Sequence, residues 1–136
     1  RMIRFAAIVP VLRVVDVERC MTWYREILGF SVDPSPDVAP FDFCILRRDD
    51  AELMLRRVKA SIARTPAAHD WDVYLRLEGN ELTALLDHAR RRTPLVRGPE
   101  VMPSGQVEFE LEDPEGHRIC VSEILDDVKG FPRAVD

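Results

Sequence analysis

The two halves of this sequence carry the same order of predicted secondary structure, and that repeat restricts the possible folds more than any single motif. Each half opens with an apolar, strand-like segment, continues with an amphipathic helix and closes with further strand-like segments. Sequence identity between the halves is too weak to prove a duplication, so only the order of elements repeats. We therefore predict an α+β protein built from two βαβββ modules.

The first half begins with a predicted buried strand over Phe5–Val15. Pro10 lies inside it and cannot donate to a sheet ladder, so the strand should lie at a sheet edge or leave one sheet to join another. A helix is predicted over 16–28, with Asp16 as its N-cap and Gly29 as the residue that ends it. Three further strands are predicted at 30–32, 41–47 and 52–58.

The second half repeats this pattern. A strand is predicted over 71–77, and Asn80 is expected to cap a helix that Arg90–Arg92 close. Strands are predicted at about 94–101, 106–112 and 118–124, the last two joined by the turn Asp113–Gly116. We expect a single domain over 1–136, divided into a first module at 4–58, a linker at 59–70, a second module at 71–125 and a C-terminal tail at 126–136.

Composition argues against several classes of function. The chain has 136 residues, 46% of them hydrophobic, so its core needs no disulfide or metal to be stable. A net charge of −5 lacks the excess of clustered cations that nucleic-acid binding requires. No apolar run is long enough to span a membrane, and no signal-peptide profile opens the chain. Three cysteines without CxxC spacing indicate buried thiols in a reducing compartment, so we expect a cytoplasmic protein.

Alternation along the strands separates an apolar face from a polar one. In residues 71–77, Val73 and Leu75 share one face while Tyr74 and Arg76 share the other. The apolar face is expected to pack on the helices. The polar face either lines a cleft that orients a polar small molecule or is simply the solvent side of the sheet, and alternation alone favours the solvent side.

Three stretches give further evidence on the fold. In order along the chain they are Val9–Phe30, Phe43–Asp50 and Gly105–His117. They contain WYREILGF at the predicted helix end and EFELEDPEGH in the last hairpin. Together they resemble the vicinal-oxygen-chelate superfamily of glyoxalases, bleomycin-resistance proteins and dioxygenases. This resemblance covers nearly the whole chain and implies two βαβββ modules whose curved mixed sheets surround a shared cleft.

The same resemblance implies where a metal would bind in the enzymes of this superfamily. The corresponding positions here are Val9, Met54, Asp72 and Cys120. Only the last two carry a side chain able to bind a metal, whereas a divalent site normally needs three or more such groups. The three histidines do not replace them, because His69, His88 and His117 are expected in the linker, on the helix surface and in a turn. We therefore expect no metal and no cofactor.

Within the superfamily the chain looks most similar to the metal-free bleomycin-resistance branch, which sequesters its drug without chemistry. There, a proline at the position of Pro10 releases the first strand to cross to a partner, and an aromatic at the position of Phe43 stacks on the drug. The resemblance therefore implies a homodimer, either with the first strand exchanged at Pro10 or with the two copies side by side. Ser104 departs from the usual aromatic before Gly105, which puts binding of bleomycin itself in doubt, although Trp71 or Trp23 could substitute.

We predict a protein that binds and sequesters a small, planar, polar or cationic molecule, such as an antibiotic-like compound. Acidic side chains would pair with ligand cations, and aromatic rings would give flat contact area. The candidate ligand-binding residues are those expected to face the cleft: Phe43, Met54, Arg56, Asp72, Tyr74, Arg76, Glu108, Glu110 and Cys120. Neither nucleic acid nor a membrane is an expected partner.

Two other classes of function stay open. An isomerase, lyase or dioxygenase would use atypical metal ligands, or a carboxylate such as Glu108 or Glu110 whose pKa is raised toward neutrality. A catalytic thiol at Cys120 would need a cation such as Arg118 to lower its pKa. A dimeric interaction module would instead fill its cleft with Arg56 and Arg76 paired to the two glutamates.

Overall fold

The predicted order of elements occurs twice in the computed structural model, which describes residues 2–61, 64, 66–67 and 69–135. The first half contains β1 (Val11–Val14), α1 (Val17–Leu28), β2 (Ser31–Ser35), β3 (Phe43–Arg48) and β4 (Ala51–Arg57). The second half contains β5 (Val73–Arg76), α2 (Leu82–Arg90), β6 (Arg97–Val101), β7 (Val107–Glu112) and β8 (Arg118–Glu123). The described part of the predicted linker forms no helix or strand, and its residues 62, 63, 65 and 68 lie outside the described residues.

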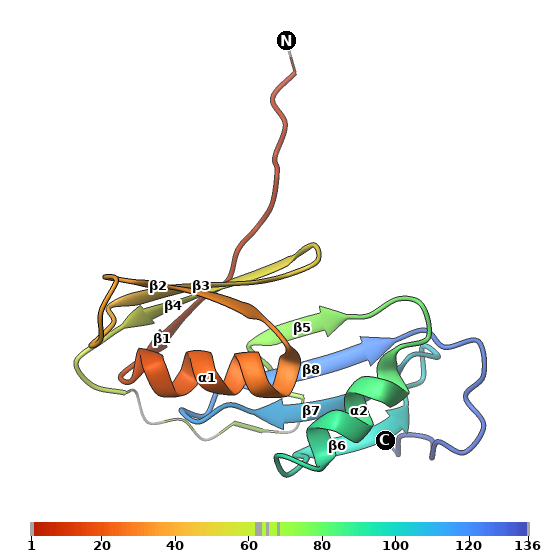
Figure 1. Ribbon diagram of the computed structural model, residues 1–136. Helices are drawn as coiled ribbons and strands as arrows, with labels where there is room; N and C mark the ends of the chain where they lie inside the picture. Colours follow the sequence, from red (N-terminus) through yellow and green to blue (C-terminus); the bar gives the residue numbers. More distant parts are fainter. Residues whose placement is uncertain (1, 62–63, 65, 68, 136) are drawn as a thin grey trace.

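Each half forms a four-stranded mixed sheet (Figure 1). Sheet A has the order β1-β4-β3-β2, and sheet B has the matching order β5-β8-β7-β6. In both sheets the first strand runs parallel to the fourth strand of the same half, and the other pairs are antiparallel. This confirms the predicted α+β class.

Local sequence explains where α1 begins and ends. The Asp16 carboxylate accepts the backbone N–H of Arg19 at 3.0 Å, as an N-cap residue does. Gly29 ends the helix in the left-handed conformation at φ 70°, where its N–H donates to the carbonyl of Arg25. Both predicted ends of this helix are confirmed.

The start of α2 differs from the prediction. Asn80 does not cap the helix with its side chain, which instead exchanges hydrogen bonds with Asp126. The buried carboxylate of Glu123, at the end of β8, accepts the backbone N–H groups of residues 80–82 at 2.5–2.8 Å. A distant carboxylate satisfies the helix N-terminus as well as a local one, because the N–H groups need only an acceptor.

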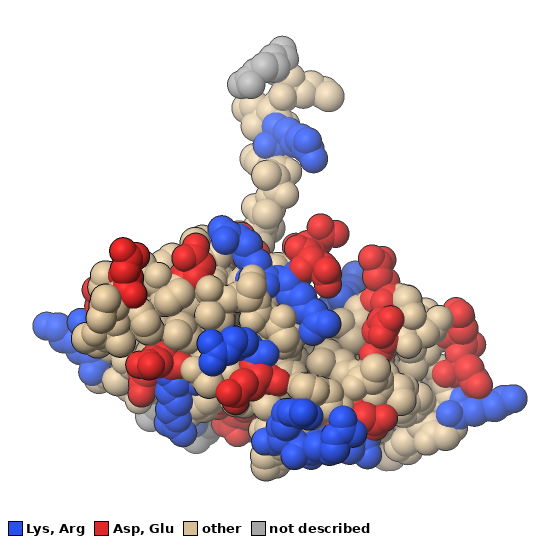
Figure 2. Space-filling view, in the orientation of Figure 1, with Lys and Arg blue, Asp and Glu red and all other residues tan. Residues whose placement is uncertain are grey.

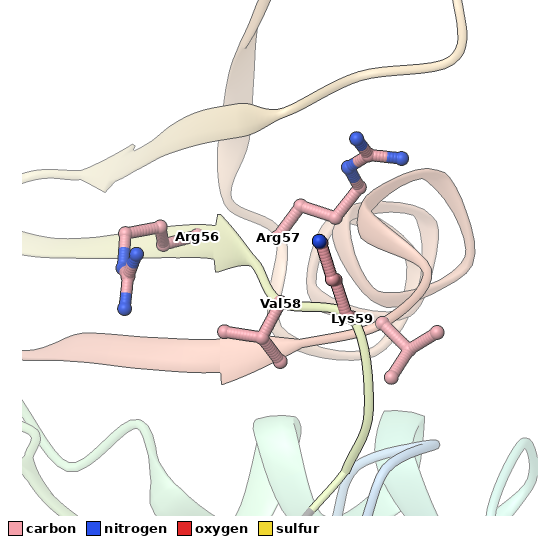
Figure 3. Close-up of a pocket in the computed structure, with 5 residues that line it drawn as sticks. Arg56, Arg57, Val58 and Lys59 are labelled. Atoms are coloured by element: carbon pink, nitrogen blue, oxygen red, sulfur yellow. The ribbon is translucent and has the colours of Figure 1, made fainter.

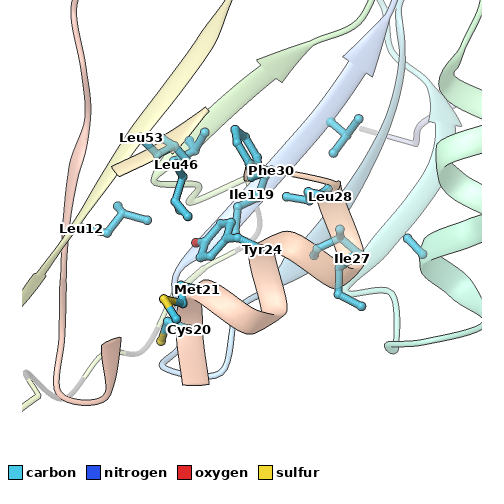
Figure 4. Close-up of a cluster of buried hydrophobic side chains, with 14 of the residues drawn as sticks. Leu12, Cys20, Met21, Tyr24, Ile27, Leu28, Phe30, Leu46, Leu53 and Ile119 are labelled. Carbon is cyan, nitrogen blue, oxygen red and sulfur yellow. The ribbon is translucent and has the colours of Figure 1, made fainter. Parts of the chain in front are cut away.

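The core joins the two halves around α1 (Figure 4). The inner face of sheet A packs against this helix with Leu12, Leu46 and Leu53, all at most 6% exposed. Ile119 of β8 lies beside Tyr24 of α1, so the helix also contacts sheet B. The three cysteines are buried as free thiols, as predicted.

The segment before β1 corrects the predicted strand Phe5–Val15, because residues 2–10 form no strand and extend away from the rest of the chain (Figure 1). Only Val11–Val14 pair, and they lie at the edge of sheet A as Pro10 predicts. We call residues 2–10 the arm. Its large apolar side chains are almost fully exposed: Met2 92%, Ile3 83%, Phe5 92% and Ile8 94%.

Charge is mixed over the surface. Acidic and basic side chains alternate on the face drawn in Figure 2, without a broad basic field of the kind that binds nucleic acid. Among the described residues, no helix combines the length and the apolar character needed to cross a membrane.

Candidate functional site

Sheet B presents a polar outer face opposite the helices. Pairing places Tyr74 beside Cys120, Glu110 beside Cys120, and Glu108 beside Ser122, so these side chains share one face. The alternate residues Phe109, Leu111 and Ile119 are at most 1% exposed and belong to the apolar core. The predicted split into a helix-facing and a polar face therefore holds on this sheet.

Arg97 of β6 lies at the centre of this polar face. Its guanidinium donates to Glu108 at 2.8 Å, to Glu100 at 2.6 Å and to Glu110 through Nε. Glu108 and Glu110 are 2% and 1% exposed, so the ion pairs are largely shielded from solvent. We call these four residues the Arg97 cluster. Three carboxylates around one guanidinium leave a formal charge of −2.

The bulge in β6 explains how Arg97 reaches both glutamates of β7. The register of the β6–β7 pair shifts between Arg97 and Glu100. Gly98 lies in this shift at φ 83°, and a Cβ atom there would overlap the backbone carbonyl of Glu108. Only glycine lets the two strands approach this closely, so sequence alternation alone could not place Arg97 on the polar face.

Hydrogen bonding sets the ionisation of Glu108. Burial favours its neutral form, but donation from Tyr74 at 2.5 Å, from Arg97 and from Gln106 outweighs burial and lowers its pKa. A lowered pKa is the opposite of what a general base near neutral pH requires. Glu110 is less fully hydrogen-bonded than Glu108, because its oxygen Oε1 is buried and has no hydrogen-bond partner among the described residues.

Aromatic side chains border the Arg97 cluster. The rings of Trp71 and Tyr74 lie 5.3 Å apart, and the Arg76 guanidinium lies 5.7 Å from the centre of the Tyr74 ring. Trp71, two residues before β5, thus lies against the ring of Tyr74. Trp23 instead packs edge-on against Tyr24 at 4.9 Å within the core region.

Cys120 shares the face but lacks the surroundings of a reactive thiol. Its side chain is fully buried, and burial together with the charge of Glu108 raises its pKa. The cation beside its sulfur is Arg97 at 3.7 Å, rather than the predicted Arg118. The sulfur therefore behaves as a packed, protonated group.

Three predicted residues lie apart from this cluster, on the outer face of sheet A. Pairing places Phe43 beside Arg56 on β3 and β4, and Met54 beside Ile45. Arg56 also borders a hollow of about 590 Å³ with Val15, Arg57, Val58 and Lys59 (Figure 3). No hydrogen bond or ion pair among the described residues joins Arg56 or Arg76 to Glu108 or Glu110, so Arg97 takes the place predicted for those two arginines.

The positions that would correspond to metal ligands do not fit a metal. Val9 and Met54 have no suitable donor atom, and the two oxygens of Asp72 accept from Arg64 at 2.8 Å and from the backbone N–H of Arg118 at 2.9 Å. Within the described ranges, no three His, Cys, Asp or Glu side chains are grouped as a metal site.

The structure corrects one histidine prediction. His69 is exposed, and His88 lies partly exposed on α2 as predicted, with Nε2 2.7 Å from the carbonyl of Glu26 of α1. His117 is buried, with Nδ1 2.9 Å from the Asp113 carboxylate. It also borders a second hollow of about 500 Å³, between β1 and the turn before β8. A turn motif cannot reveal this burial, because it depends on Tyr24 and Asp113 meeting from different halves of the chain.

Several solved structures share this fold. TioX from Micromonospora sp. ML1 matches with a TM-score of 0.70 and 17% identity, over 89% of this chain and 100% of that one. Lactoylglutathione lyase from Agrobacterium tumefaciens matches with a TM-score of 0.64 and 18% identity, over 94% and 99%. The bleomycin-binding protein from bleomycin-producing Streptomyces verticillus, complexed with copper(II)-bleomycin, matches with a TM-score of 0.60 and 25% identity, over 93% and 100%.

Sequence comparison leads to the same family. No curated protein matches this sequence. The family model of the Glyoxalase/Bleomycin resistance protein/Dioxygenase superfamily matches residues 4–121, which span both helices, all strands except the last two residues of β8, and most of the polar face described above. With most of the sequence matched, and with the fold shared by a bleomycin-binding protein and by an enzyme, the chain belongs to this superfamily.

Proposed function

We propose that the protein binds and sequesters a small, planar, cationic molecule without a metal, using the outer faces of its sheets. One observation carries this proposal: three carboxylates share a single guanidinium in the Arg97 cluster, and Glu110 Oε1 has no partner among the described residues. A buried acceptor without a donor is costly, and a ligand cation with N–H groups would satisfy it. The rings of Trp71 and Tyr74 would give the ligand its flat contact surface.

Access to this acceptor requires some movement. Glu100 is the most exposed acid of the Arg97 cluster, with a side-chain exposure of 22%, so it is the first group that an arriving cation meets. Glu110 Oε1 is shielded from solvent, so the ligand reaches it by displacing a side chain that covers it. Such a site favours a cation that brings several donors, because it must compensate for the contacts that are lost.

The proposed binding form is a homodimer. Each chain carries Phe43, Met54 and Arg56 on sheet A, and the acidic residues on the separate sheet B. We propose that sheet A of one copy faces sheet B of the other, so that each cleft combines an aromatic and apolar wall with an acidic one. The arm supports a second copy as the partner, because its exposed apolar side chains would be covered by pairing with that copy.

The binding test uses proflavine, a planar cation, and copper(II)-bleomycin, the ligand named for a structural neighbour. We expect saturable binding of proflavine and weaker binding of copper(II)-bleomycin, because Ser104 replaces the usual aromatic, with each compound recovered chemically unchanged. Glu110→Gln should weaken proflavine binding at least ~10-fold, because a charge-assisted contact is lost. Glu112→Gln is the matched control, since Glu112 is an exposed acid on the same strand. Chemical modification of every bound compound, or equal binding by both variants, would contradict sequestration at this face.

The dimer test removes residues 2–9 and measures mass in solution by light scattering. We expect the full chain to be a dimer and the truncated chain a folded monomer, because the arm makes little contact with its own chain. Monomeric full-length protein, or a dimer that survives truncation, would contradict exchange of the arm.

A further inference from the structure

His117 stands at a hollow that the proposed function does not use. Its Nδ1 faces the buried carboxylate of Asp113, so the opposite edge of the ring, with Nε2, points away from that partner. Nε2 has no partner among the described residues, and His117 borders the hollow. A histidine oriented in this way by a carboxylate presents a donor to the hollow when it is protonated.

The acids around this hollow are already engaged. Asp72 accepts from Arg64 and from the backbone of Arg118 through separate oxygens. Glu115 accepts the backbone N–H groups of Val15 at 2.6 Å and Asp16 at 2.8 Å. These carboxylates therefore have few acceptor sites left for a ligand cation.

The donors around the hollow are freer than the acceptors. Arg13 is exposed, and its side chain makes no hydrogen bond or ion pair within the part of the chain that the structure describes. Arg64 already donates to Asp72 at 2.8 Å and to the carbonyl of Gly116 at 3.4 Å, but its guanidinium carries further N–H groups. Val11, Leu12 and Val58 add an apolar wall. With Asp113, which His117 contacts, counted beside Asp72 and Glu115, the two arginines and a protonated His117 bring the formal charge to zero, and of these cations Arg13 is the one without a partner among the described residues.

We propose that this hollow binds a small organic carboxylate with an apolar body, its carboxylate held by His117, Arg13 and Arg64. The unpartnered guanidinium of Arg13 and the Nε2 edge of His117 suit a single carboxylate, and the apolar wall suits an aliphatic or aromatic body. The volume of about 500 Å³ is ample for a compound of one ring. This site carries the opposite charge preference to the Arg97 cluster and involves none of its residues.

The protonation of His117 depends on every charged group that faces it. The hydrogen bond with Asp113 raises its pKa, burial opposes this, and the charges of Asp113 and Asp72 raise it further while Arg64 lowers it. Glu115 lies in the same turn, and Tyr24 reaches the same Asp113 carboxylate from α1. Carboxylate binding should therefore weaken as pH rises through the pKa of His117, because the ring loses its donated proton and its charge.

The test follows the three histidine signals by NMR in the full chain during titration with benzoate. We expect the His117 signals to move saturably and the His117 pKa to rise in the presence of benzoate. His117→Asn should weaken benzoate binding at least ~10-fold, since a charge-assisted donor is lost. Asparagine is chosen because its amide can still donate to Asp113 but does not titrate. Arg13→Gln, at an exposed position, should weaken binding about threefold without affecting folding.

His88→Asn is the matched control, because this histidine links the two helices and does not border the hollow. It should bind benzoate as the parent chain does. The proposal fails if benzoate leaves the His117 signals unmoved or if His117→Asn and Arg13→Gln bind benzoate as tightly as the parent. Inorganic phosphate moving those signals when benzoate does not would overturn the assignment to a carboxylate with an apolar body.

Discussion

Two groups of buried carboxylates in sheet B differ in how fully their oxygens are hydrogen-bonded. Asp113, at the end of β7, is fully partnered: it accepts from Tyr24 at 2.7 Å, from His117 Nδ1 and from the backbone N–H groups of Glu115 and His117. In the Arg97 cluster, three carboxylates compete for one guanidinium, and Glu110 Oε1 stays without a partner among the described residues. The first arrangement is complete, while the second retains capacity for another donor.

This difference separates a structural role from a binding role. A saturated carboxylate holds the surrounding backbone in place and gains nothing from a ligand. An unsaturated one costs stability until something binds, which is typical of functional sites. The pKa of Asp113 agrees with a structural role. Burial favours the neutral carboxyl, but hydrogen bonds from His117 and Tyr24 outweigh burial and lower the pKa.

The largest expected effect comes from removing the fully partnered carboxylate of Asp113. Asp113→Ala should lower the free energy of unfolding by about 3–5 kcal/mol, because it leaves a buried hydroxyl, an imidazole and two backbone N–H groups without an acceptor. Urea unfolding measures this. Glu110→Ala is the comparison and should cost less than about 2 kcal/mol, since Arg97 keeps two other carboxylates. Equal costs would show that the two clusters do not differ in the way described.

Gly98 tests how the Arg97 cluster is assembled. Gly98→Ala should destabilise the protein by about 2–3 kcal/mol and weaken proflavine binding, because the new Cβ would push β6 away from β7. Gly105→Ala is a matched control, with φ 100° but no atom within 4 Å of its Cβ, and should cost about 1 kcal/mol. Thermal unfolding and proflavine titration of both variants check this prediction. Similar losses of stability and affinity in the two variants would mean that the positive φ angle alone, without the clash with β7, causes the effect.

Two tyrosine variants compare the Asp113 carboxylate with the Arg97 cluster, because each variant removes one hydrogen bond. Tyr24→Phe should cost about 1–2 kcal/mol, because the Tyr24 hydroxyl is buried and donates to Asp113. Tyr74→Phe should cost no more than about 1 kcal/mol, because Arg97 and Gln106 still donate to Glu108. Chemical unfolding with both variants checks the order, and a costlier change at Tyr74 would reverse the interpretation.

The smallest effect is a pH dependence. The hydrogen bond with Asp113 raises the folded pKa of His117 above the ordinary value of 6.5, so its contribution to stability is fully present below pH 6.5 and is lost as pH rises through the folded pKa. Within that window, the free energy of unfolding should decline by at most about 1.4 kcal/mol per pH unit. His117→Asn should remove this slope. Asp113 acts with the opposite sign, because its stabilising contribution is lost in acid as pH falls through its lowered pKa.

Much of the fold could be predicted because it rests on local patterns. The Asp16 cap, the Gly29 stop and the strand alternation are all properties of short windows, and the structure has the corresponding elements. The predicted strand over residues 5–10 was wrong for the single chain because periodicity reports that a segment suits a strand, without saying whether a neighbouring strand is there to pair with.

The candidate site was harder to predict because its contacts are long-range. Arg97 reaches the polar face through a bulge that breaks alternation, and Glu123 caps α2 across a sequence separation of 41–43 residues. His117 is buried by a partner network that joins α1 to the last hairpin. Tyr74, Glu108 and Glu110 were placed on one face correctly, because their strands alternate without interruption.

The contact of Glu115 with the start of α1 also bears on how the chain folds as it is synthesised. The carboxylate of Glu115 accepts the N–H groups of Val15 and Asp16, across a sequence separation of 99–100 residues. A ribosome adding about 5–20 residues per second takes roughly 5–20 s to supply this acceptor after Val15 is made. Until then the first half lacks both this contact and the wall of sheet B that covers α1. Because such distant contacts form late, the two halves should become stable together, and a nascent first half should depend on the ribosome or a chaperone to keep its apolar helix face from aggregating.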